Sequence, residues 1–440
     1  MRHNGTMTYI YNLKNRLKNS KLVNDSFWAI FGNVLGKGLS LLTVIIIARI
    51  LGKEVYGEYG IVNGTIASIL IFTNFGLNYT STKYIAEYKT TKPELLSQII
   101  KSCRQLTLFF SGFATLVLFL GAEYIATHLL NLPKLSFFLR LISINILVGS
   151  LCRTQEGILA GLGKFKVLAK INTIIGIGNF LMGVVLTYVY GLTGAFISSI
   201  FLQILSYFLL RYNIVKNVVP VDKEIKTKIS LREILKFSTP VALQEAFYSI
   251  ITYSTGLLLV QLSTYGEVGL SSAAVYWSAI ILYIPGILRN VILSHLSATL
   301  GNNKARLRIL RLILIFNFCV TLLLSLTVYF LSDYIVAFYG DNFSGLKFVL
   351  NISVFTTIFS SMSNVYAQAY MSENKNWLML FFRIIRDGSI FGIAYFLLTQ
   401  NGGIDGALSL AKSSLWANIL FLILIAGFYE LIINKNKSST

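Results

Sequence analysis

The hexapeptide YGEYGI at residues 56–61 recurs as YGEVGL at residues 265–270, which is 209 positions later. A second pair of segments, GLTGA at 191–195 and GIDGA at 403–407, is separated by 212 positions. Lys164 and Lys375 form a third pair, with a separation of 211 positions. Three matches in the same order at nearly constant separation indicate that the chain consists of two similar halves.

The composition is that of a membrane protein. Of the 440 residues, 55% are hydrophobic and only 13% are charged, and the mean hydropathy is +0.68. A soluble domain carries about 25% charged residues. A helix that crosses a bilayer needs about 20 mostly apolar residues. Such stretches lie near 26–50, 56–79, 104–128, 136–158, 167–189 and 193–215 in the first half, and near 237–262, 269–292, 309–332, 346–371, 377–399 and 406–433 in the second.

The net charge of +20 is concentrated in alternate connections between these stretches. In a soluble protein such a charge would indicate nucleic acid, but Lys and Arg in loops are the usual mark of the cytoplasmic side of a membrane protein. We therefore expect no nucleic acid partner, and a multi-pass protein of the inner membrane with both termini in the cytoplasm. The basic residues are Lys83, Lys89, Lys92, Lys101 and Arg104 after the second span, Lys164, Lys166 and Lys170 after the fourth, Lys216, Lys223, Lys226, Lys228, Arg232 and Lys236 after the sixth, and Lys304, Arg306, Arg308 and Arg311 after the eighth.

The expected fold is an all-α polytopic membrane protein with about twelve transmembrane helices in two parallel six-helix repeats. The repeats are parallel because each half has an even number of spans and begins on the same side. The linker between the halves has apolar residues in a helical rhythm, which fits an interfacial amphipathic helix and equally an ordinary solvated linker. The predicted parts are a cytoplasmic amphipathic segment at 1–25, an N-terminal six-helix lobe at 26–215, the cytoplasmic linker at 216–236, a C-terminal six-helix lobe at 237–433 and a cytoplasmic tail at 434–440.

The sequence gives no indication of a metal site, a disulfide framework, a cofactor or direct use of ATP. Cys103, Cys152 and Cys319 are scattered and do not cluster with histidines, and no GxxxxGK[ST] sequence occurs. If the protein were an enzyme, the class to consider would be a membrane-embedded polysaccharide polymerase or acyltransferase. Such enzymes usually present catalytic residues in a sizeable outer loop, whereas the largest outer loop here, at 333–347, is short. We therefore predict a protein that is not an enzyme.

Several motifs resemble one family. RILGKEVYG at 49–57 is similar to the RxLGxxxYG stretch of bacterial polysaccharide repeat-unit flippases (O-antigen or capsule, Wzx-type) of the multidrug/oligosaccharidyl-lipid/polysaccharide (MOP) exporter superfamily. FGL at 75–77 with KYIAE at 83–87, GILAGLGKF at 157–165 and FSTP at 237–240 also look like segments of that family.

The resemblance covers nearly the whole chain. It implies two six-helix lobes in a V around a central cavity, which carries an undecaprenyl-pyrophosphate-linked oligosaccharide to the outer leaflet by alternating access. The implied partners are membrane lipid, the polyprenyl-pyrophosphate-linked substrate and a coupling ion, either H⁺ or Na⁺. We expect a monomer working with the polysaccharide polymerase machinery. Related branches, which move the peptidoglycan precursor or expel drugs, are the alternatives.

Ionisable residues inside the spans are the candidate functional residues, because burial there costs about 2.5 to 3.5 kcal/mol or more. Lys37 lies near the midplane of the first span, on one face with Asn33 and Ser40. Glu245 lies at mid-depth in the seventh span, where a carboxylate could bind a proton or Na⁺. Lys412 lies about 10 Å inward from the outer end of the twelfth span.

The eleventh span carries Arg383, Arg386 and Asp387 on one stripe. We expect an ion pair between Arg383 and Asp387, which would leave Arg386 as surplus positive charge. Arg140 lies one turn below the outer surface, where a place in the cavity and snorkelling to the interface are equally plausible. The predicted cationic cavity for the pyrophosphate thus contains Lys37, Arg383, Arg386, Lys412 and Arg140, and the predicted ion-coupling residues are Glu245 and Asp387.

The tenth span adds neutral polar residues. Ser361, Asn364 and Gln368 follow helical spacing, and with Asn33 they are suited to contact sugar hydroxyls. Hydrogen bonding between helices explains such residues equally well. The net positive interior argues against a multidrug antiporter, which would need a cavity that is negative or apolar enough for cationic drugs.

Overall fold

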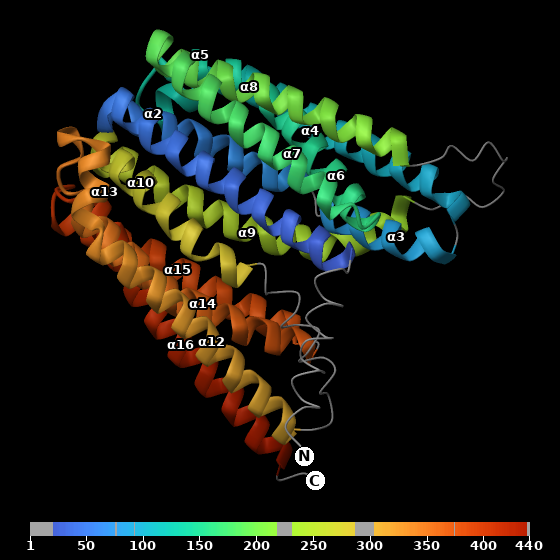
Figure 1. Cartoon of the computed structure of the whole chain (residues 1–440). Coiled ribbons are helices and arrows are strands. Elements are labelled where there is room, and N and C mark those ends of the chain that lie inside the picture. The colour runs from blue at the N-terminus through green and yellow to red at the C-terminus, as the bar shows by residue number, and fades with distance from the viewer. Residues whose placement is uncertain are drawn as a thin grey trace, which may run out of the picture. The chain divides into compact units, whose positions relative to one another are not determined.

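The computed structural model describes residues 21–74, 77–91, 93–217, 231–286, 303–373 and 375–437 (Figure 1). Throughout these ranges the regular structure is helical, which confirms the predicted all-α fold class. Most of the predicted amphipathic N-terminal segment and of the linker, and the end of the tail, lie outside the described residues. The side chains of Asn33, Lys37 and Glu245 are also outside the description.

Two long helices of the first half each contain parts of two predicted spans. α2 bends at Gly52, where φ is 72° and ψ is 165°, and α8 bends at Gly191, where φ is 58° and ψ is −136°. Glycine adopts a positive φ at little steric cost, so the chain turns at both positions. The helices of this half are α2 (Lys21–Asn74), α3 (Leu77–Thr91), α4 (Leu96–Tyr124), α5 (Leu135–Ile142), α6 (Ile144–Gly161), α7 (Phe165–Gly178) and α8 (Val184–Asn217).

The second half contains α9 (Leu231–Leu262), α10 (Tyr265–Ile281), α12 (Asn303–Phe330), α13 (Ser332–Tyr339), α14 (Leu346–Ser372), α15 (Asn376–Gln400) and α16 (Gly406–Lys437). Within the described residues of both halves, six helices are long and apolar enough to cross a bilayer, judged by length and composition. These are Leu96–Leu129, Leu135–Gly161, Phe165–Lys216, Arg306–Phe330, Leu346–Tyr370 and Gly406–Glu430.

The repeat seen in the sequence reappears in the backbone. Lys164 precedes α7 with φ −87° and ψ 46°, and Lys375 precedes α15 with φ −90° and ψ 42°. The two lysines, 211 positions apart, therefore occupy the same kind of turn at the same place in each half.

The chain forms two compact units. Unit 1 consists of 1–44, 69–120 and 140–242, and unit 2 consists of 45–68, 121–139 and 243–440. In unit 1, hydroxyl groups link neighbouring helices: Thr73 and Ser150 lie 2.7 Å apart, and Thr107 and Thr154 lie 2.8 Å apart. Small polar residues commonly join helices in membranes in this way.

In unit 2, α14 packs against α12, α15 and α16, and Figure 1 shows these four helices, coloured orange to red, running side by side. Their shared core includes Leu310, Val365, Tyr370, Phe382 and Tyr429.

The two copies of the repeated hexapeptide meet inside unit 2. A methyl group added to Gly57 would lie 1.8 Å from the carbonyl oxygen of Tyr265, and one added to Gly269 would lie 2.2 Å from the carbonyl oxygen of Lys53. No side chain fits at either position, so the glycines permit close contact between α2 and α10. Both hexapeptides are helical in the structure and lie just beyond the turns that precede them.

Candidate functional site

One buried ion pair in unit 2 joins consecutive residues of α15. Nε of Arg386 lies 2.7 Å from Oδ1 of Asp387, and Nη2 lies 2.7 Å from the same oxygen. The side chains are 11% and 6% exposed, and the Phe421 ring of α16 lies 5.2 Å from the guanidinium carbon. The predicted pairing of Asp387 with Arg383 is therefore wrong, and Arg386 is not surplus. Helical spacing predicts only the direction in which a side chain leaves the backbone. The arginine side chain is long enough to curl back to the adjacent residue, so spacing did not predict this pair.

Arg383 occupies a different environment one turn earlier on α15. Its guanidinium carbon lies 5.6 Å from the ring centroid of Tyr248 on α9, which is within the range of a cation–π contact. The side chain is partly buried. Arg383 and Arg386 thus provide two guanidinium groups on neighbouring turns, each supported by an aromatic ring.

Lys412 lies at another depth. It is exposed on α16, nine residues before Phe421, and this corresponds to about 13 Å along the helix axis. Because Phe421 contacts Arg386, Lys412 is separated from that arginine by a similar distance along the bundle. We expected one pyrophosphate to be held by Arg386 and Lys412 together, and the structure does not bring these two residues to one level.

Four other predicted residues lie on three different helices. Arg140 is exposed and belongs to unit 1, at the end of α5. Lys37 lies in α2 and Glu245 in α9, but because their side chains are outside the description, their roles stay predictions, as does that of Asn33.

The neutral polar residues of α14 divide into two kinds. Ser361 is buried and donates a hydrogen bond to Oδ1 of Asn317 on α12, at 3.2 Å, which favours a role in helix packing. Gln368 is also buried. Asn364 is exposed and is therefore the member of the predicted sugar-contacting set that remains accessible on α14.

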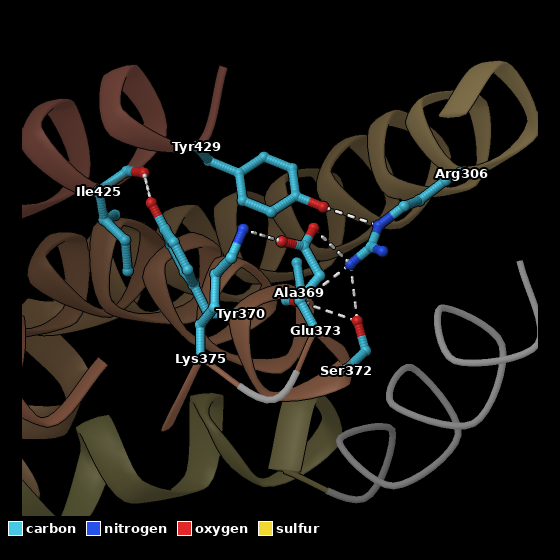
Figure 2. A network of polar contacts seen from close by, with 8 residues as sticks. All are labelled: Arg306, Ala369, Tyr370, Ser372, Glu373, Lys375, Ile425 and Tyr429. Carbon is cyan, nitrogen blue, oxygen red and sulfur yellow. Dashed lines mark hydrogen bonds and ion pairs between the residues drawn. The ribbon is translucent and has the colours of Figure 1, made fainter. Parts of the chain in front are cut away.

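A polar network at the ends of α12, α14 and α16 was missed by the sequence analysis, which treated Arg306 only as a loop charge (Figure 2). The Arg306 side chain is 5% exposed. Its Nε donates to the Tyr429 hydroxyl at 2.8 Å, and its Nη2 donates to the Ala369 carbonyl at 2.9 Å and to Ser372 Oγ at 2.7 Å. The same Nη2 lies 2.9 Å from Oε1 of Glu373.

Lys375 binds the other carboxylate oxygen of Glu373, so the acid lies between two cations, as Figure 2 shows. Nearby, the Tyr370 hydroxyl donates to the Ile425 carbonyl at 3.0 Å. The network thus connects the end of α14 to both flanking helices. The sequence signal for this network was Glu373 itself, an isolated acidic residue in a basic connection.

Unit 1 has a simpler counterpart. Lys89 Nζ donates to the carbonyl of Leu162, at the end of α6, at 3.0 Å. Each half therefore has a basic residue before its third span that binds a carbonyl at the end of its fourth span: Lys89 with Leu162 in the first half, and Arg306 with Ala369 in the second. The C-terminal end of a helix carries partial negative charge, which such a cation stabilises.

The arrangement in unit 2 is suited to anion binding rather than metal chemistry. Among the residues that the structure describes, no three His, Cys, Asp or Glu side chains lie together so as to hold a metal ion. Arginine, by contrast, presents several N–H donors in a plane and binds phosphate oxygens in pairs. The stripe formed by Arg383 and Arg386 therefore has the chemistry to hold a phosphate group.

Comparison with known proteins identifies a family by sequence. The model of the family described as "Polysaccharide biosynthesis protein" matches residues 22–289. An uncharacterised membrane protein of Methanocaldococcus jannaschii is 23% identical over 286 residues, which cover 60% of this chain and 66% of that protein. The match thus spans just under two thirds of that relative's length.

Solved structures share the fold at low sequence identity. An inward-facing multidrug resistance MATE family transporter of the MOP superfamily superposes with a TM-score of 0.80 at 14% identity, over 94% of this chain and 99% of that one. The lipid II flippase MurJ, in an inward closed conformation, gives 0.69 at 16% identity, over 91% and 87%. A MOP superfamily transporter from Pyrococcus furiosus gives 0.69 at 14% identity, over 96% and 98%. The family match covers more than half of the chain and agrees with the resemblance of its motifs, so the chain belongs to the polysaccharide biosynthesis protein family and has the fold of the MOP superfamily of transporters.

Proposed function

We propose that the protein moves an undecaprenyl-pyrophosphate-linked oligosaccharide repeat unit from the inner to the outer leaflet of the cytoplasmic membrane, by alternating access, for O-antigen or capsule synthesis. The observation that carries the proposal is the pair of guanidinium groups on neighbouring turns of α15, Arg383 beside the Tyr248 ring and Arg386 beside the Phe421 ring. Arg386 is paired with Asp387, and Lys412 is exposed further along α16.

Positive charge is expensive inside a bilayer, and a substrate that carries two phosphates offsets that cost. A charge-assisted hydrogen bond between a guanidinium and a phosphate oxygen is about twice as strong as a neutral one. In the proposed mechanism Arg383 and Arg386 hold the pyrophosphate, and Asn364 contacts sugar hydroxyls. Lys412, about 13 Å further along α16, provides a second position for the anion on its path outward. We propose Lys37, Arg140 and Asn33 as further substrate-binding residues, and Glu245 as the site of a coupling H⁺ or Na⁺.

Two other functions use the same fold. A peptidoglycan-precursor flippase would carry the same pyrophosphate, and one structural neighbour is a lipid II flippase. The family match to polysaccharide biosynthesis favours an oligosaccharide. A multidrug antiporter is the other alternative, and one neighbour is named as a multidrug resistance transporter. Such a protein must bind cationic drugs, which two arginines and a lysine would repel.

Proteoliposomes distinguish these functions. The purified protein is reconstituted with fluorescent polyprenyl-pyrophosphoryl oligosaccharide, with fluorescent lipid II, or with a cationic dye in the lumen. We expect faster transbilayer movement of the oligosaccharide lipid than of lipid II, and no efflux of the dye above that from protein-free vesicles. Preference for lipid II would make the protein a peptidoglycan-precursor flippase. Dye efflux without lipid movement would overturn the proposal in favour of an antiporter.

A further inference from the structure

The ion pair between Arg386 and Asp387 has an unusual geometry for two buried charges. Consecutive residues of a helix do not face each other, so Arg386 must curl back along α15 to reach its neighbour. Both of its contacts, at 2.7 Å, go to a single oxygen, Oδ1. A guanidinium that binds a carboxylate most strongly uses both oxygens in two parallel hydrogen bonds. The observed pair therefore leaves part of the donor capacity of Arg386 unused.

Asp387 has one cation in contact within the described part of the chain. α15 packs against α14 and α16. α14 carries no charged residue between Lys347 and Glu373, and the spanning part of α16 carries Lys412, which lies about 13 Å further along its helix. Arg383 on α15 itself contacts Tyr248 of α9, the helix that also carries Glu245. If Arg386 is withdrawn, a carboxylate that is 6% exposed loses the cation that neutralises it.

We propose that Asp387 is the resident counter-ion of Arg386, which the phosphate of the substrate displaces, so that each bound substrate brings one proton onto Asp387. This inference rests on the proposed function and concerns its coupling. An uncompensated buried carboxylate is strongly unfavourable, and a buried group in this position neutralises itself instead. The balance is simple: Arg386 exchanges one anionic partner for another, the Asp387 carboxylate becomes a carboxylic acid, and no covalent bond to the substrate forms.

The exchange has a defined pH dependence. Because a proton is taken up on binding, affinity for the substrate rises as the pH falls, by up to tenfold per pH unit for one linked proton. Removing the carboxylate abolishes this dependence. It also removes the competitor for Arg386, so that the variant binds the anion more tightly than the natural protein does.

The test uses full-length protein in detergent and farnesyl-pyrophosphoryl-N-acetylglucosamine as the probe. Each phosphorus of this probe carries one ester bond and one anhydride bond, and its single acidic oxygen keeps a fixed charge near neutral pH. Isothermal titration calorimetry in two buffers of different ionisation enthalpy measures the protons taken up per probe bound. We expect close to one proton for the natural protein and none for Asp387→Asn, which should also bind the probe several-fold more tightly. Asp333→Asn, which removes an exposed acid paired with Lys347 at 2.6 Å, is the matched control and should still take up one proton.

Asp387→Asn leaves the buried Arg386 without its counter-ion, and this variant could fail to fold for that reason. A second variant covers that case. Arg386→Gln combined with Asp387→Asn removes both charges, and we expect it to fold, to bind the probe at least tenfold more weakly and to take up no proton. Binding by the natural protein without proton uptake, or uptake that persists in the double variant, would overturn the inference and leave the proposed function standing. Failure of the natural protein to bind the probe would overturn both.

Discussion

Arg306 should contribute more to the stability of unit 2 than either of the charged residues beside it. Replacing Arg306 with Ala removes hydrogen bonds to Tyr429, Ala369 and Ser372 and the ion pair with Glu373. Removing one partner of a buried charge pair costs about 3 to 5 kcal/mol. Because Lys375 still neutralises Glu373 in this variant, we expect the lower end of that range, about 3 kcal/mol.

Replacing the acid should cost less. In Glu373→Gln the amide oxygen can still accept a hydrogen bond from Arg306, which also keeps its three other acceptors. The loss is therefore the charge contribution to one hydrogen bond, at most about 1.5 to 3 kcal/mol. Lys375→Ala removes a cation whose side chain is 32% exposed, and pairs exposed to this degree contribute about 0 to 1 kcal/mol. The predicted order of destabilisation is therefore Arg306, then Glu373, then Lys375.

Thermal unfolding of the purified variants in one detergent measures this order. Lys347→Ala serves as the control, because it breaks a pair in which both side chains are largely exposed, 44% for Lys347 and 72% for Asp333, and it should change the free energy of unfolding by less than about 1 kcal/mol. If Arg306→Ala unfolds at the same temperature as Lys347→Ala, the network in Figure 2 does not stabilise the helix ends and the reasoning fails.

Three further predictions concern packing, binding and topology. Gly57→Ala and Gly269→Ala should each lower the free energy of unfolding by about 1 to 3 kcal/mol or more through overpacking, and so lower the yield of folded protein. Gly64→Ala, where an added methyl group meets nothing within 4 Å, should not. Equal yields of all three variants on fluorescence-detected gel filtration would contradict the close contact. Arg383→Ala and Lys412→Ala should each weaken binding of a polyprenyl-pyrophosphoryl sugar by tenfold to over a hundredfold, the loss of one charge-assisted hydrogen bond, and unchanged affinities in titration calorimetry would exclude both residues from the anion path. Reporter fusions after residues 90, 225 and 305 should report the cytoplasm and fusions after 132, 265 and 342 the exterior, and an inversion at any of them would refute the assignment from loop charge.

The helical nature of the protein, the position of its long apolar segments, its repeat and its family follow from the sequence. These properties depend on composition, on the length of apolar runs and on the spacing of short motifs, all of which are read along one dimension. The turn at Lys164 and its counterpart at Lys375 illustrate this, because a constant separation in the sequence became the same backbone conformation in both halves.

The partners of the charged residues depend on the tertiary structure. Helical spacing favoured Arg383 as the partner of Asp387, but a long side chain can reach an adjacent residue, and the ring of Phe421 on another helix covers the resulting pair. In the sequence Arg306 was interpreted as a solvated loop charge, but in the structure its side chain is buried at the ends of three helices (Figure 2). The repeated glycines showed that two segments were related, but not that the segments pack against each other. In each case the outcome depends on which faces of distant helices meet, and the period of a single helix carries no information about its neighbours.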